Sequence, residues 1–119
     1  MNRFHDRIRS AVQDELDAAT QADERGEADT SFRCLERAHV LGQSSTLLHI
    51  RVHCLMLRWA IRQHLSAEAA GQLLRIVSAA CKTAIGWVPR GNTGGADVSP
   101  LGRMPIPADL QRQLDAARR

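Results

Sequence analysis

The stretch CLERAHVLGQSSTLLHIRVHCLMLRWAIRQH, residues 34–64, decides the fold. It contains two runs in which apolar side chains recur every three or four residues, the period of an amphipathic α-helix. Gly42 interrupts the pattern, and the polar residues that follow it form a short linker. We therefore predict one helix that ends near Leu41 and a second that runs from about Leu47 to His64.

The same helical period continues on both sides of this stretch. Residues 3–24 form one further amphipathic run, and a turn around Gly26 separates it from the helix that Asp29 or Thr30 is expected to cap. Ser66 is expected to cap a fourth helix that ends near Gly86. The apolar stripe of this fourth helix consists of Ala70, Leu73, Leu74, Val77, Cys81, Ala84 and Ile85. No strand pattern alternates with these helices, so the fold class is all-α: a four-helix bundle in a single domain spanning residues 1–119.

Residues 86–107 break the helical pattern. They contain all four prolines and five of the eight glycines, which predicts a long irregular loop before a short C-terminal helix over residues 108–117. Trp87 is expected to anchor this loop on the bundle, because a glycine- and proline-rich segment needs an apolar contact to stay ordered. Residues 91–95 lack the lysine of a phosphate-binding loop, which disfavours a phosphate site. We interpret this segment either as a tight turn or as a lid over the end of the bundle.

Composition excludes several classes of protein. The 119 residues are 44% hydrophobic and 24% charged, which is typical of a folded globular domain. No apolar run reaches membrane-spanning length, and the N-terminus has no signal-peptide core, so we expect a cytoplasmic protein with reduced cysteines. The net charge is only +3 and aromatic residues make up 3%, which disfavours a nucleic-acid or membrane partner.

Polar side chains lie on the apolar faces of three predicted helices. Glu15 follows Val12 by three residues, and Glu36 and His39 share the stripe of the second helix; His49 and His53 point away from the arginines of the third. Buried carboxylates and imidazoles are usually paired or bound to metal. The spacings Glu-x-x-His and His-x-x-x-His allow two side chains of one helix to hold one ion.

We therefore predict a metal site whose ligands are Glu15, Glu36, His39, His49 and His53. Oxygen and imidazole ligands favour a divalent transition metal, zinc or iron first, with manganese and copper as further options. Two other interpretations remain open at this point. The residues could form a buried hydrogen-bond network, or Glu15 could pair with an arginine of a neighbouring helix.

Cysteines and arginines suggest weaker alternatives. The three cysteines form no Cys-x-x-Cys motif and are interpreted as small core residues, with Cys54, which flanks the inner face of its helix, a secondary candidate for a soft metal. Arg51, Arg58 and Arg62 share one sector of the third helix, which is either a solvated face or a surface for a protein partner or a second copy of the chain. A mononuclear or dinuclear metal enzyme is a further alternative, although no separate general base is evident.

Four segments resemble a bacterial family catalogued as domain of unknown function 3703. They are CLERAHVLGQ at residues 34–43, HIRVHCLMLRW at 49–59, GQLLRIVSAACKTAIGWVPRGNTGGADVSP at 71–100 and MPIP at 104–107. The resemblance covers nearly the whole chain. It implies a metal role, since proteins of this family are expected to be encoded near heavy-metal resistance genes, but it identifies no ligand and no reaction. Residues 18–41 also resemble one hairpin of a tetratricopeptide repeat, in a single copy, which would suit an adaptor.

Overall fold

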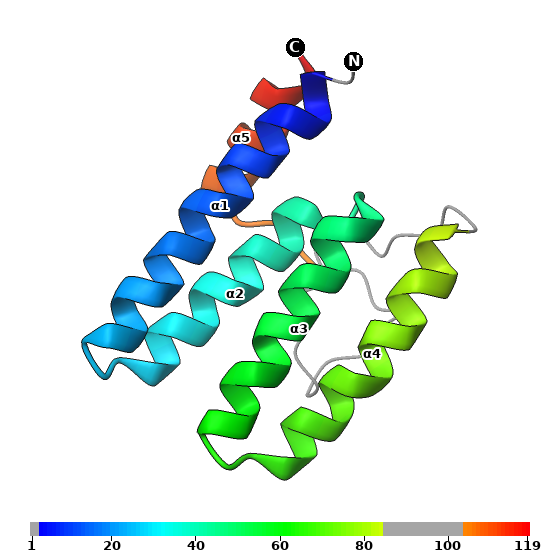
Figure 1. Cartoon of the computed structure of the whole chain (residues 1–119). Helices are drawn as coiled ribbons and strands as arrows, with labels where there is room; N and C mark the ends of the chain where they lie inside the picture. Colours follow the sequence, from blue (N-terminus) through cyan, green and yellow to red (C-terminus); the bar gives the residue numbers. More distant parts are fainter. Residues whose placement is uncertain (1–2, 85–103) are drawn as a thin grey trace.

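The computed structural model describes the backbone of residues 3–84 and 104–119 and the side chains of residues 3–76 and 104–119, and within them it contains helices and no strand (Figure 1). The helices are α1 (Arg3–Glu24), α2 (Ala28–Gly42), α3 (Thr46–Arg62), α4 (Ser66–Ala84) and α5 (Ala108–Arg118). The predicted fold class, an all-α four-helix bundle followed by a short C-terminal helix, is confirmed. Residues 104–107 are irregular, as predicted, whereas the rest of the predicted loop and its anchor Trp87 lie outside the described residues.

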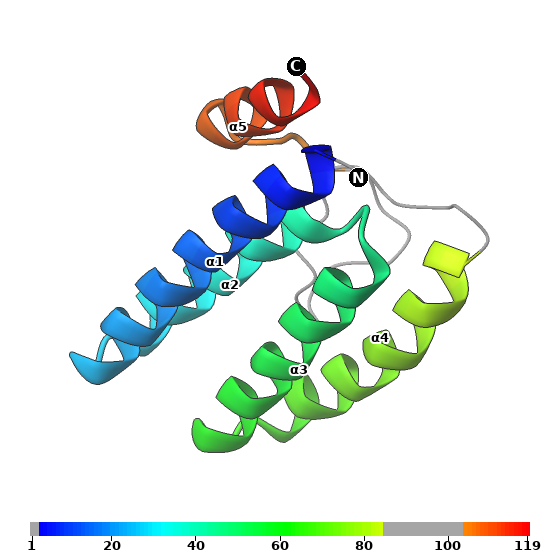
Figure 2. The same ribbon diagram turned by 45° about the horizontal axis from the view of Figure 1, so that its top comes forward.

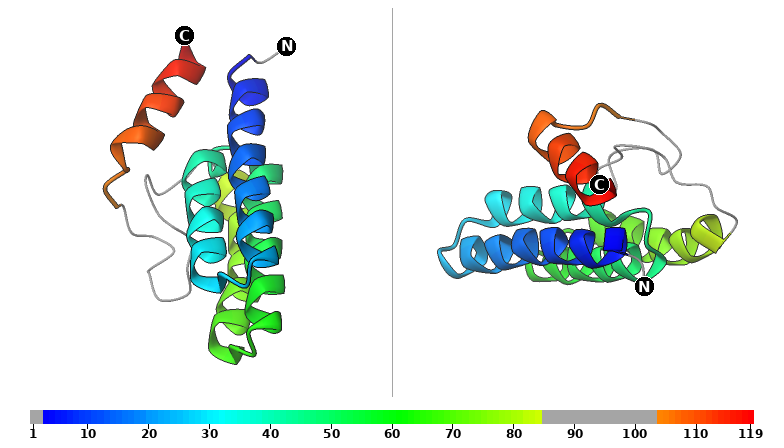
Figure 3. Two further views of the ribbon diagram at one scale, coloured as in Figure 1. Left: turned by 90° about the vertical axis from the view of Figure 1, so that its left-hand side faces the viewer. Right: turned by 90° about the horizontal axis from the view of Figure 1, so that it is seen from above.

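The four main helices form two antiparallel hairpins, α1–α2 and α3–α4, which are joined through a contact between α2 and α3 (Figures 1 and 2). Within the first hairpin, the buried hydroxyl of Ser31 donates to the carbonyl of Ala19 at 2.9 Å. Between the hairpins, the Trp59 indole N–H donates to the carbonyl of Ala28 at 3.0 Å. The shorter helix α5 packs on α1 and α2 on the side away from α3 and α4 (Figure 3).

The core follows the predicted apolar stripes of α1, α2 and α3. Its least exposed apolar side chains are Ile8, Val12, Ala22, Ala38, Leu41, Val52, Met56, Ala60 and Leu110. Gly42 lies where three helices meet: a Cβ atom there would stand 3.2 Å from both Leu48 Cβ and Val12 Cγ2. A glycine at this position therefore lets the end of α2 approach α1 and α3 closely.

The helix ends explain how the hairpins turn. Gly26 after α1 and His64 after α3 both adopt positive φ, at 74° and 59°, and in each case the next residue's N–H returns to a carbonyl five residues earlier. This is the Schellman arrangement that ends a helix with a left-handed residue. Ser45 caps α3 by accepting a bond from the Leu48 N–H. The predicted caps of α2 are wrong, because α2 already begins at Ala28 and Asp29 and Thr30 lie inside it.

Two predictions about buried residues are also wrong. Leu73 and Leu74 belong to the predicted apolar stripe of α4 but are 58% and 66% exposed. Among the described helices, α4 packs extensively only against α3, so this part of its surface has no described helix over it. Cys54 is exposed rather than a core residue, whereas Cys34 is half-buried and packs against the core. The side chain of Cys81 lies outside the described residues. None of the described helices is long and apolar enough to cross a membrane.

Candidate metal centre

Three histidines from two helices meet inside the bundle. His39 lies in the last turn of α2, and His49 and His53 lie one turn apart on α3. The three side chains are only 3%, 5% and 2% exposed. The linker between Gly42 and α3 is short, so the end of α2 and the start of α3 lie side by side and bring the imidazoles together.

The three imidazoles direct their Nε2 atoms toward one point. His39 Nε2 lies 2.8 Å from His49 Nε2 and 3.1 Å from His53 Nε2. One ligand atom from each residue can be chosen so that all lie within 4.8 Å of one another. For a tetrahedral zinc ion with Zn–N bonds of about 2.0 Å, the nitrogen atoms would be about 3.3 Å apart. The two distances from His39 Nε2 would therefore lengthen by only a few tenths of an ångström around an ion of this size.

A glutamine on α4 orients one of the imidazoles. His53 Nδ1 lies 2.6 Å from Gln72 Oε1, and the Gln72 amide nitrogen donates to Glu68 Oε1 at 2.8 Å. The amide oxygen can only accept, so this contact assigns the proton of a neutral His53 to Nδ1. The Nε2 atom, which faces the other two histidines, then carries a lone pair. Such outer hydrogen bonds are typical of metal-bound histidine.

Gln72 is not among the predicted site residues, although its position in the sequence carries a signal. Gln72 is completely buried in α4, and it follows the half-buried Glu68 by one helical turn. A glutamine one helical turn after a carboxylate is the pattern that could have indicated a relay to a buried polar group.

The contacts among the three histidines constrain where their protons lie. With a lone pair on His53 Nε2, the contact to His39 requires either a proton on His39 Nε2 or a cation between the two rings. A single proton on His39 Nε2 would have to be shared between His49 and His53 in a three-centre bond. A bound cation would instead accept one lone pair from each of the three rings. The geometry thus fits both a hydrogen-bonded network and a metal centre.

The predicted carboxylates lie outside the group of converging histidine atoms. Glu15 accepts a hydrogen bond from Arg37 Nε at 2.9 Å, which confirms the alternative that it pairs with an arginine of a neighbouring helix. Glu36 is half-buried on α2, one turn before His39, and its carboxylate is not among the ligand atoms that converge. The structure therefore brings together three of the five predicted side chains, and all five remain predicted as ligands.

Among the described residues, no cysteine belongs to the group of converging ligand atoms. Burial raises the pKa of the Cys34 thiol, with a smaller contribution from the negative charge of Glu15. A raised pKa disfavours the thiolate form, which is the form that binds metals.

Arg37 connects three helices through Glu15 and Asp109. Its guanidinium, on α2, forms ion pairs with Glu15 on α1 and Asp109 on α5. We expect Arg37→Ala to lower the free energy of unfolding by about 1–2 kcal/mol, because the mostly buried Glu15 carboxylate loses its charged partner. Urea denaturation would measure this loss, with Arg33→Ala as the exposed control. Equal losses in the two variants would contradict a connecting role for Arg37.

Acid should weaken the same connection. The hydrogen bond from Arg37 lowers the pKa of Asp109 below its ordinary value. A carboxyl group whose pKa is lower in the folded chain contributes stability above its unfolded pKa of about 3.9, and this contribution is lost as the pH falls through the folded value. The stability difference between wild type and Asp109→Asn should accordingly shrink below about pH 4.

These observations define an all-α protein whose two helical hairpins enclose a buried cluster of three histidines. A family model described as "Protein of unknown function (DUF3703)" matches residues 6–114. The chain belongs to this family, in agreement with the resemblance noted in its sequence. No curated protein and no solved structure matches the chain.

Proposed function

We propose that the protein binds one divalent transition-metal ion through the Nε2 atoms of His39, His49 and His53. The observation that carries the proposal is the convergence of these atoms, from two helices, within a site that is almost completely shielded from water. Each imidazole is an expensive group to bury without a partner, and one cation would satisfy three of them together. Imidazole donors suit zinc, iron and copper better than magnesium or calcium.

Zinc or iron(II) are the ions we expect first, with copper or manganese as further candidates. Three protein ligands leave one position of a tetrahedral ion for water or another group. Glu36 is the carboxylate nearest in sequence to a member of the cluster, and we retain it as a candidate for this position. Glu15 is the weaker candidate, since Arg37 already pairs with it.

The ion would bridge the two hairpins. His39 belongs to the first hairpin, whereas His49, His53 and the supporting Gln72 belong to the second. A metal bound to all three histidines would bind the assembled bundle and not the unfolded chain, so it would stabilise the fold. We include metal handling or a heavy-metal response in a cytoplasmic setting in this proposal, on the basis of the family resemblance and the free thiols.

Calorimetric titration of untagged, chelator-treated protein with zinc, anaerobic iron(II), manganese and copper(II) would test the proposal. We expect about one ion per chain, bound more tightly than about 10 μM, which corresponds to about −7 kcal/mol. Thermal unfolding should shift to higher temperature with the same ion. If none of the four ions reaches this affinity, the cluster is a hydrogen-bond network and the metal proposal is wrong.

A further inference from the structure

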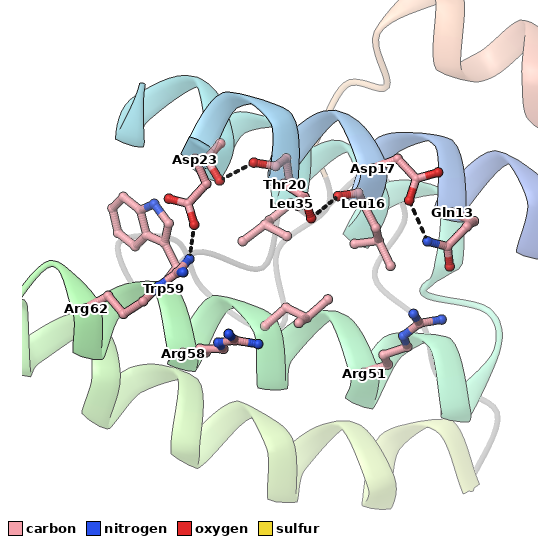
Figure 4. Close-up of a pocket in the computed structure, with 13 residues that line it drawn as sticks. Gln13, Leu16, Asp17, Thr20, Asp23, Leu35, Arg51, Arg58, Trp59 and Arg62 are labelled. Carbon is pink, nitrogen blue, oxygen red and sulfur yellow. Dashed lines mark hydrogen bonds and ion pairs between the residues drawn. The ribbon is translucent and has the colours of Figure 1, made fainter. Parts of the chain in front are cut away.

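A groove lies between α1 and α3 on the opposite side of α3 from the histidines. It has a volume of about 240 Å³, and its walls come from both helices (Figure 4). Each residue turns by about 100° around a helix, so Arg51, two positions from both His49 and His53, faces away from them. The groove is thus separate from the candidate metal centre.

The α3 wall carries three arginines with different environments. Arg62 forms an ion pair with Asp23 across one end of the groove (Figure 4). Arg51 and Arg58 also line the groove and are exposed. Neither of these two guanidinium groups has a hydrogen bond or an ion pair within the described part of the chain.

The α1 wall leaves positive charge in excess. Asp23 is already paired with Arg62, and Asp17 accepts a hydrogen bond from the Gln13 amide at 2.8 Å. Three arginines therefore face two aspartates, and the two arginines without partners share the α3 wall. A ligand for this groove should carry more negative than positive charge.

The floor and the spacing of the charges indicate the size of the ligand. Leu16, Leu35, Leu55 and Trp59 form an apolar floor between the charged rims. Arg51 and Arg58 are seven residues apart, which is about 10.5 Å along the axis of α3. The two guanidinium groups lie apart along the groove (Figure 4), so an elongated ligand with two separated negative charges can meet both of them where they stand. On a helical ligand, two carboxylates at i and i+7 have the same spacing and leave room for apolar side chains at i+3 and i+4.

We propose that this groove binds an acidic amphipathic helix of a partner protein. Carboxylates of the partner would pair with Arg51 and Arg58, while apolar side chains between them would contact Leu55 and Trp59. A guanidinium group can form a bidentate pair of hydrogen bonds with one carboxylate. This geometry favours specific arginine–carboxylate pairs over non-specific electrostatic attraction. Since the charged rims are exposed, binding should weaken as salt increases.

The test uses a fluorescein-labelled helical peptide with glutamates at i and i+7 and leucines at i+3 and i+4, titrated with the full chain and followed by fluorescence anisotropy. We expect saturable binding that Arg51→Glu/Arg58→Glu weakens at least about tenfold. Arg33→Glu/Arg112→Glu, which changes net charge equally at two exposed sites outside the groove, should change it by less than about twofold. Circular dichroism would verify that both variants stay helical.

Four outcomes would overturn the proposal. The first is the absence of saturable binding below about 1 mM peptide, and the second is an equal loss in the control variant. The third is unchanged affinity when glutamines replace both glutamates of the peptide. The fourth is complete displacement of the peptide by millimolar inorganic phosphate at constant ionic strength, which would identify a site for small anions instead.

Discussion

His53→Ala should weaken zinc binding at least about 100-fold, or about 2.7 kcal/mol, relative to wild type. The imidazole is 2% exposed, its Nε2 atom faces His39, and Gln72 holds its other nitrogen. Loss of a direct ligand should cost at least as much as loss of a supporting hydrogen bond, which typically costs 10- to 100-fold. His39→Ala and His49→Ala should have effects of similar size, because each removes one of the three converging nitrogen atoms.

Calorimetry with controls would measure these losses. Cys34→Ser and Cys54→Ser should bind zinc as wild type does, because neither thiol belongs to the histidine cluster. Glu15→Gln should weaken zinc binding much less than any of the three histidine variants, since Arg37 already pairs with the carboxylate. His53→Gln, which keeps a polar side chain of similar size, distinguishes a lost ligand from a collapsed core. Histidine variants that bind as tightly as wild type, together with weakened cysteine variants, would indicate a thiolate site instead.

Gln72→Leu should weaken metal binding about 10- to 100-fold without removing a ligand. Gln72 is completely buried, and its oxygen accepts from His53 Nδ1 at 2.6 Å. Leucine has a similar volume but cannot accept this bond, so the imidazole loses the contact that directs its Nε2 lone pair toward the cluster. Gln72→Glu should restore much of the affinity, because a carboxylate can accept the same hydrogen bond.

Cobalt(II) titration followed by visible absorption would separate positioning from general stability. The Gln72→Leu variant should bind cobalt(II) more weakly and should show an altered d–d absorption spectrum of the bound ion. The Gln72→Glu variant should have a spectrum closer to that of the wild type. Gln111→Leu is the matched control: Gln111 donates to Asp115 at 2.9 Å, an i,i+4 pair like that of Gln72 and Glu68, but on α5. An unchanged affinity and spectrum in Gln72→Leu would show that the relay does not position His53. Wild-type protein that binds no metal would refute the metal proposal itself.

The sequence was sufficient to predict the helices and three members of the cluster. Apolar residues recurring every three or four positions fix which side of each helix is buried, and this placed His39, His49 and His53 on inward faces. Gly42 marked the end of α2, and Ser45 caps α3 within the predicted linker. These features depend on neighbours within a few residues, so local sequence determines them.

Tertiary structure alone decided which neighbour each inward polar group meets. Glu15 lies on an inward face, as its spacing predicts, but the packing of α1 on α2 brings it to Arg37 rather than to the histidines. Gln72 reaches His53 only because α4 lies beside α3. The helical period gives the direction of a side chain around its own axis, whereas the partner depends on the offset and rotation between helices. Those quantities are set by the packing of many side chains at once, and no single spacing in the sequence records them.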